Sequence, residues 1–246
     1  MRPRVPAALP RYRRELPYGW VLGAFQVEAL LRHAPERALE VRWHGTLAGD
    51  RRERLLAACS RAGVPTRRDD ATVAAKRSKG TARVLAVFAK VDAELRADRP
   101  HLALVAPRDP GNLGATLRTA LAFGVEDVAV VGGGLDPGSP HVLRASLGAA
   151  FALRVREAPS LTAYRSAWPD RPLWLLDARG ETGVDELAAG PWPATLAAGP
   201  EWPGLSDDVR RLGRRVRIDH DPRVESLNVT VAVGIALRAL QGAAPA

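Results

Sequence analysis

Three polar segments of the 246-residue sequence each lead into a predicted helix. The first, residues 109–118, reads Asp-Pro-Gly-Asn-Leu-Gly-Ala-Thr-Leu-Arg and contains the spacing N-x-G-x-x-x-R. The second, residues 199–205, reads Gly-Pro-Glu-Trp-Pro-Gly-Leu, and the third, residues 225–232, reads Glu-Ser-Leu-Asn-Val-Thr-Val-Ala. Backbone N–H groups converge at a helix start, and the planar fork of an arginine suits phosphate. The segments therefore offer hydrogen-bond donors to whatever group sits beside them.

Other motifs do not carry their usual chemistry. The run Gly132–Gly134 follows a predicted strand, but a G-x-G-x-x-G match from Gly132 puts Pro137 at the third glycine. A nucleotide-dependent oxidoreductase would rest on these glycines alone. Ser146 lacks the first glycine of a nucleophile elbow, and the five histidines show no metal-ligand spacing, so we expect no metal.

Strand-like and helix-like stretches alternate along the chain, which predicts an α/β fold. Before residue 100 they predict helices over 21–32 and 51–61 and strands over 37–43, 64–67 and 82–88. Beyond it they predict strands over 101–106, 128–131, 153–156, 173–177, 195–198 and 216–218 and helices over 113–123, 142–149, 160–166, 207–212 and 229–240, with Ser206 capping the fourth of these. The apolar strands indicate a parallel sheet covered on both faces. The polar segment 92–100 is a predicted linker between domains 1–95 and 101–246.

Composition indicates a globular protein with a nucleic-acid partner. Hydrophobic residues make up 46% and charged residues 26%, which excludes a disordered or collagen-like chain. The net charge of +9 is typical of a protein that binds nucleic acid. Most basic clusters precede residue 100, so we expect the first domain to bind the substrate. No stretch approaches the ~18 apolar residues of a membrane span, and the single Cys59 agrees with a reducing compartment, so we expect a cytoplasmic protein.

In their order and separations, the three polar segments resemble the motifs of the TrmH (SpoU) family, the 2'-O-ribose RNA methyltransferases of the SPOUT superfamily. The resemblance covers residues 101–242, is supported by Arg144-Ala-Ser-Leu-Gly148, and extends more weakly to 23–30 and 79–82. It implies a small α/β RNA-binding domain, followed by a parallel sheet threaded into a deep trefoil knot. It also implies S-adenosylmethionine as cofactor, a homodimer, and methyl transfer to a ribose 2'-hydroxyl of structured RNA, ribosomal RNA rather than tRNA.

The resemblance also assigns the site residues. Its polar catalytic set is Asn112, Arg118, Glu201, Ser226 and Asn228. Backbone contacts from the loops at Gly199, Ile218 and Leu227 hold the adenosyl part of the cofactor. For RNA binding we expect the basic residues Arg11, Arg13, Arg14, Lys76, Arg77, Lys79 and Arg144.

Three alternatives stay open at this point. Arg118 acts either as the base that accepts the hydroxyl proton or as a phosphate clamp, and a guanidinium is a poor proton acceptor. Ser226 and Asn228 would otherwise only cap the last helix. The chain also reads Ile218-Asp219-His220 where the family's third motif usually opens Ile-Pro-Met. We expect backbone contacts to the cofactor to tolerate this change, but a weakly active or inactive ribosome-assembly factor of the same fold is the alternative function.

Overall fold

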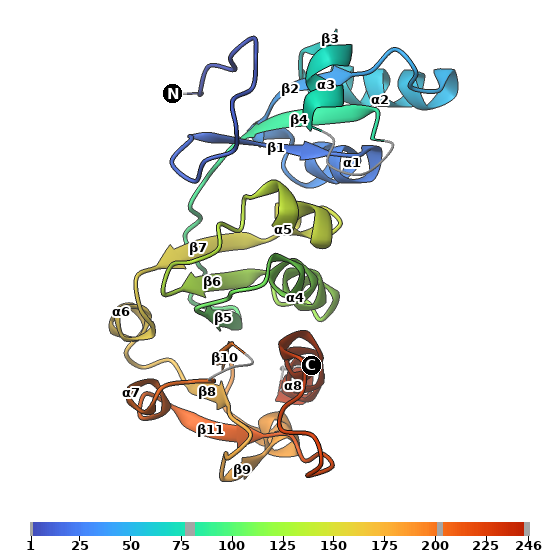
Figure 1. Cartoon of the computed structure of the whole chain (residues 1–246). Coiled ribbons are helices and arrows are strands. Elements are labelled where there is room, and N and C mark those ends of the chain that lie inside the picture. The colour runs from blue at the N-terminus through green and yellow to red at the C-terminus, as the bar shows by residue number, and fades with distance from the viewer. Residues whose placement is uncertain (1, 77–81, 201–203, 244–246) are drawn as a thin grey trace. The chain divides into compact units, whose positions relative to one another are not determined.

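The computed structural model describes residues 2–76, 82–200 and 204–243, which form two compact units (Figure 1). The first unit is Met1–Val91 with Gly138–Ala152, and the second is Asp92–Pro137 with Leu153–Ala246. Gly138–Ala152 thus packs with the first unit, although the sequence places it within 101–246. No helix in the described ranges is long and apolar enough to cross a membrane.

The first unit contains a mixed four-stranded sheet. Its strands are β1 (Tyr18–Leu22), β2 (Ala38–Trp43), β3 (Thr66–Arg68) and β4 (Val84–Ala89), in the order β1-β4-β2-β3. β4 runs antiparallel to both β1 and β2, and β3 lies parallel to β2. The helical elements of this unit are α1 (Ala24–His33), η1 (Pro35–Arg37), α2 (Gly49–Arg61), α3 (Asp70–Lys76), α5 (Pro140–Ala145) and η2 (Ala149–Ala152).

The predicted helix 21–32 is wrong at its start, because Val21 and Leu22 belong to strand β1. Gly23 separates the strand from helix α1 with a φ of 103°, a conformation that glycine adopts without strain. A Cβ at this position would lie 2.5 Å from Gln26 Oε1. The apolar residues before Gly23 match a helical face by type, so periodicity alone assigned them to the helix.

The second unit contains a seven-stranded parallel sheet, which confirms the predicted α/β class. Its strands are β5 (His101–Val105), β6 (Asp127–Val131), β7 (Arg154–Ala158), β8 (Leu173–Leu176), β9 (Thr182–Gly183), β10 (Thr195–Ala198) and β11 (Arg214–Arg217), in the order β7-β6-β5-β10-β8-β11-β9. The helical elements are α4 (Pro110–Ala122), α6 (Leu161–Ala167), η3 (Val184–Ala189), α7 (Asp207–Arg210), α8 (Val229–Leu240) and η4 (Gln241–Ala243). Figure 1 shows α4 and α8 on one side of the strands and α6 and α7 on the other.

Capping and burial explain the ends of these elements. Asp109 caps α4 by accepting from the Asn112 N–H at 2.7 Å, and Asn228 caps α8 by accepting from the Thr230 N–H at 2.9 Å. Ser206 occupies the N-cap position of α7, but its side chain makes no capping bond, so the predicted cap is wrong in its chemistry. One face of the sheet buries a core that includes Ala103, Leu161, Leu175 and Ala197.

The predicted linker 92–100 contains no helix or strand and packs on the second unit. Arg96 fastens it by donating from Nε to the fully buried carboxylate of Asp127 at 2.9 Å. The glycine loop 132–134, with φ values of 83°, 70° and 88°, leads to no helix start before Pro140. The dinucleotide-binding arrangement of strand, glycine turn and helix is therefore not formed there.

Candidate functional site

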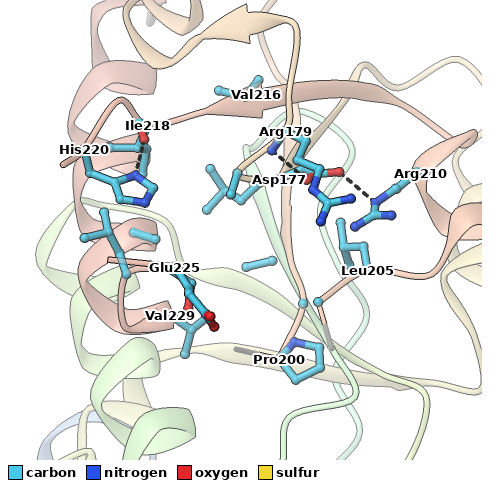
Figure 2. A pocket seen from close by; sticks show the side chains of 18 residues that line it. Asp177, Arg179, Pro200, Leu205, Arg210, Val216, Ile218, His220, Glu225 and Val229 are labelled. Atoms are coloured by element: carbon cyan, nitrogen blue, oxygen red, sulfur yellow. Dashed lines mark hydrogen bonds and ion pairs between the residues drawn. The ribbon is translucent and has the colours of Figure 1, made fainter. Parts of the chain in front are cut away.

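A cavity of about 650 Å³ lies in the second unit where the carboxyl ends of β8, β10 and β11 meet the start of α8. Open parallel sheets bind their ligands outside the carboxyl ends of the strands, and ligand pockets typically measure about 300 to 1,000 Å³. Its lining residues are Leu176, Asp177, Ala178, Arg179, Ala198, Gly199, Pro200, Gly204, Leu205, Arg210, Val216, Ile218, His220, Glu225, Ser226, Leu227, Val229 and Ala232 (Figure 2).

The lining includes four residues that the sequence assigns to the site. Gly199, Ile218 and Leu227 are the predicted cofactor contacts, and Ser226 is one of the predicted polar residues. Glu201 lies outside the described residues. A Cβ at Gly199 would lie 2.7 Å from Leu205 Cδ2, so any side chain at this position would crowd Leu205. The ends of β10 and β11 and the start of α8 thus bring together residues that are separated by almost thirty positions in the chain.

An ion pair that the sequence analysis missed forms one wall of the cavity. Asp177 follows β8 directly, its side chain is 5% exposed, and its Oδ2 lies 2.8 Å from Arg210 Nε. Its Oδ1 accepts from the backbone N–H of Arg179 at 3.0 Å. The hydrogen bond to Asp207 and, after it, the nearby charge of Asp177 raise the pKa of Arg210, and burial opposes them. The signal for Asp177 in the sequence is its place at the end of a buried strand.

His220 holds the opposite wall, at the point where the chain departs from the family motif. Its Nδ1 lies 2.7 Å from the Ile218 carbonyl oxygen, and its Nε2 lies 3.2 Å from the Val224 carbonyl oxygen. Asp219, which lies just after β11, accepts a hydrogen bond from Arg217 Nε at 2.8 Å. The side chains of this departure therefore fix the loop, while Ile218 still lines the cavity.

Asn112 and Asn228 join the starts of α4 and α8. Asn228 Nδ2 donates to Asn112 Oδ1 at 3.0 Å, and Thr230 Oγ1 donates to the Asn112 carbonyl at 3.3 Å. Asn112 also lines a small cleft that shares Gly199, Pro200 and Val229 with the main cavity. The structure thus places this amide pair beside the cavity, and Asn228 caps α8 at the same time.

Arg118 is the remaining described member of the predicted polar set. It lies on α4 with its side chain exposed, and no residue that the structure describes pairs with its guanidinium. A free, exposed guanidinium is able to reach an external anion. In the described ranges, no group of three or more His, Cys, Asp or Glu residues could hold a metal ion.

The predicted RNA-binding residues belong to the first unit. Arg11, Arg13 and Arg14 are exposed in the segment before β1, and Arg144 is exposed in the last turn of α5. Lys76 is half-buried: its Nζ donates to the Pro10 carbonyl at 2.5 Å and lies 4.7 Å from the ring centroid of Trp20. Burial lowers the pKa of Lys76. Arg77 and Lys79 lie outside the described residues.

Basic side chains hold the N-terminal arm, residues 2–16, against the first unit. The fully buried Arg42 donates to the carbonyl oxygens of Pro6 at 2.7 Å and Ala7 at 2.8 Å. It also pairs with Glu40 and Asp69. Lys90 Nζ donates to the Arg14 carbonyl at 2.8 Å. Through these bonds the arm presents its exposed arginines on a fixed backbone.

Comparisons with known proteins identify the same family as the sequence motifs. The model of the SpoU rRNA Methylase family matches residues 99–238. An uncharacterized tRNA/rRNA methyltransferase of Synechocystis sp. is 38% identical over 153 residues, 58% of this chain and 54% of that protein. The 23S rRNA (guanosine-2'-O-)-methyltransferase RlmB of Shewanella oneidensis is 32% identical over 238 residues, 88% of this chain and 94% of that protein.

The fold matches a solved structure as well. The AdoMet-bound rRNA methyltransferase from Sinorhizobium meliloti superposes with a TM-score of 0.77 at 23% identity, over 93% of this chain and 88% of that chain. The chain spans about half the length of the Synechocystis relative and nearly all of the Shewanella relative. The structural likeness establishes the fold, and the family model covers more than half of the chain.

Proposed function

The chain belongs to the SpoU rRNA methylase family, and from this premise we propose that it transfers the methyl group of S-adenosylmethionine to a ribose 2'-hydroxyl of structured RNA. One observation carries the proposal. Gly199, Ile218 and Leu227, from three separate loops, line one cavity of about 650 Å³ beside the hydrogen-bonded pair Asn112 and Asn228. A cofactor cavity next to a polar rim is the arrangement that a methyl transfer requires.

The cavity fits the proposed cofactor by its chemistry. S-adenosylmethionine supplies a methyl group bound to a positively charged sulfur. Leu176, Ala198, Leu205 and Val216 are among the apolar residues that border the space, as suits an adenine ring. Ile218 also lines this space, and the cavity is large enough for a drug-sized ligand. Gly199 keeps the neighbouring loop close without a side chain in the way.

The side chains at the rim position the acceptor. Holding reacting atoms ~3 to 3.5 Å apart contributes roughly 7 to 11 kcal/mol in well-oriented systems. Asn112 and Asn228 are fixed by their mutual bond of 3.0 Å and orient the ribose. Arg118 clamps an RNA phosphate, because a guanidinium stays charged in proteins and binds phosphate with two parallel N–H groups. The hydroxyl proton leaves to an RNA phosphate or to water.

Ribosomal RNA is the proposed substrate rather than tRNA. A relative that matches 88% of the chain is named as a 23S rRNA enzyme, and the net charge of +9 suits a large polyanion. The exposed Arg11, Arg13, Arg14 and Arg144 contact its backbone, and the same role falls to Lys76, Arg77 and Lys79. Such a substrate goes with a cytoplasmic location.

The active form is a homodimer with a knotted second domain. Val231 and Ile235 lie one turn apart on α8 with 52% and 39% of their surface exposed, which gives an apolar face for a second copy. The strand order β5-β10-β8, in which a later strand lies between two earlier ones, suits a threaded chain end. Size-exclusion chromatography with light scattering tests the dimer directly.

The activity test uses labelled S-adenosylmethionine and total RNA from cells that lack the modification. Label should enter ribosomal RNA, and the phosphodiester next to the labelled ribose should resist alkali because its 2'-oxygen is methylated. Cofactor binding without transfer to any RNA would instead support the ribosome-assembly factor. Transfer to a base, with no alkali resistance, would contradict the proposed 2'-O chemistry.

A further inference from the structure

Two opposite charges border the cavity without partners. Arg179 follows β8, and none of the described residues pairs with its guanidinium. Glu225 precedes α8, and its carboxylate likewise has no ion-pair partner within the described ranges. Both are exposed and both line the cavity. Figure 2 shows them on different sides of it, Arg179 beside Asp177 and Glu225 on the side of Val229.

The other charged groups of this wall, Asp177 and Arg210, already form an ion pair with each other. Arg210 Nε lies 2.8 Å from Asp177 Oδ2, and Arg210 Nη1 donates to Asp207 at 2.9 Å. Asp177 also accepts from the Arg179 backbone N–H at 3.0 Å, which fixes the start of the Arg179 loop. Among the residues that the structure describes, this leaves Arg179 on the β8 side and Glu225 on the α8 side without an ion-pair partner.

A free cation and a free anion across one cavity suit a zwitterion. A phosphate would gain from Arg179 but would be repelled by Glu225, whereas an amino acid carries a carboxylate and an ammonium close together. Arginine binds a carboxylate through two parallel N–H groups, and a carboxylate accepts from the N–H groups of an ammonium. The electrostatics therefore favour an α-amino-acid group in this part of the cavity over an RNA phosphate.

Resting on the proposed function, we propose that Arg179 and Glu225 form the subsite for the amino-acid end of S-adenosylmethionine. Arg179 binds the α-carboxylate, and Glu225 binds the α-ammonium. The apolar part of the cavity near Ile218 and Leu227 then holds the adenosine end. The pair makes the cavity selective for the complete cofactor over adenosine derivatives that lack the amino acid.

Two ligands separate this subsite from the rest of the cavity. S-adenosylhomocysteine and 5'-methylthioadenosine share the adenosine and the thioether, but only the first carries the amino acid. Calorimetric titration should show that Arg179→Ala weakens S-adenosylhomocysteine about tenfold or more, as for the loss of charged hydrogen bonds, while 5'-methylthioadenosine binds as before. Glu225→Gln should follow the same pattern, and Arg179→Lys should recover part of the affinity.

The matched control is Arg211→Ala, which removes an exposed arginine that already pairs with Asp208 outside the cavity. It should leave both affinities unchanged. Equal losses for both ligands in Arg179→Ala, or no loss for either, would overturn the subsite. If the wild-type protein binds neither ligand, the proposed function itself fails. Retained binding of 5'-methylthioadenosine shows at the same time that the variant has folded.

Discussion

Gly199 is a lining residue at which an added side chain would change the shape of the cavity. It lines the main cavity and the neighbouring cleft, and a Cβ there would lie 2.7 Å from the buried side chain of Leu205. Because Leu205 belongs to the core of the second unit, it has little room to yield. The loop can reach its position against Leu205 only without a side chain at this point.

Gly199→Val is expected to weaken binding of S-adenosylhomocysteine at least tenfold. The branched side chain must push the loop away from Leu205, and overpacking of this kind costs roughly 1 to 3 kcal/mol. Calorimetric titration and thermal denaturation measure the two effects. Gly183→Ala is the control, because nothing lies within 4 Å of a Cβ there. Undiminished affinity in the valine variant would show that the loop is not part of the cofactor cavity.

Asn228 and Ser206 allow the helix cap to be tested as a matched pair. Both stand at the N-cap of a helix, but only Asn228 makes the capping bond. Asn228→Ala should lower the free energy of unfolding by about 1 kcal/mol and should slow methyl transfer as well, because Asn112 loses its partner. Ser206→Ala should change stability by less than about 0.5 kcal/mol. Urea denaturation measures the stability, and initial rates measure methyl transfer. A normal rate of methyl transfer in Asn228→Ala would show that this residue only caps the helix.

At the scale of elements, the two ends of the parallel sheet of the second unit have different tasks. The carboxyl ends of β8, β10 and β11 border the cavity. At the other end, His101 opens β5 and Thr195 opens β10, and Tyr164 lies between them. Its hydroxyl oxygen is 2.7 Å from both His101 Nδ1 and Thr195 Oγ1. This buried network ties β5, α6 and β10 together where no ligand has to enter.

The His101 network should make stability depend on pH. Burial lowers the pKa of His101 from 6.5 to about 4, so the folded protein keeps the ring neutral where the unfolded chain would bind a proton. The stabilisation is complete above about pH 6.5 and is lost as pH falls toward 4, by roughly 2 to 3 kcal/mol. Urea denaturation between pH 4 and 7 measures it. His101→Phe should flatten this dependence, whereas the exposed His141→Gln should retain it; an equal slope in all three proteins would assign the effect to other groups.

At the scale of the whole molecule, several of the positive charges are exposed on the N-terminal arm. The N-terminal arm carries Arg11, Arg13 and Arg14 exposed, while Arg42, Lys76 and Lys90 hold the backbone of the arm. Basic residues therefore serve two purposes here: those outside the arm fix its backbone, and those on the arm are exposed to solvent. An arm fixed in this way loses little conformational entropy when it binds a polyanion.

Replacing Arg11, Arg13 and Arg14 with alanine should weaken RNA binding and reduce its salt dependence. Each phosphate contact releases counterions, so the slope of log affinity against log salt should fall in magnitude by roughly 2 to 3. Filter binding between 50 and 300 mM salt measures the slope. A triple alanine variant of Arg54, Arg211 and Arg223 removes the same charge from residues already paired with carboxylates, and it should leave the slope almost unchanged. Equal slopes for the two triple variants would show that the arm does not contact the RNA.

The sequence by itself determined the class of the second unit and the segments that border its cavity. Apolar strands such as 195–198 and the last helix, 229–240, are local patterns, and the structure has both within these bounds. The loops of Gly199, Ile218 and Leu227 were singled out through the resemblance to the TrmH (SpoU) family, although the Ile218 loop departs from its motif. Local periodicity and capping act over a few residues, so a single chain segment contains the information.

Only the tertiary structure decided which segments meet. Asp177, Arg179 and Arg210 come to the cavity because β8 lies between β10 and β11, an order that no local pattern specifies. The packing of Gly138–Ala152 with the first unit depends in the same way on contacts between distant parts of the chain. Strand order and packing follow from how all the apolar faces are buried together, which is a property of the whole chain.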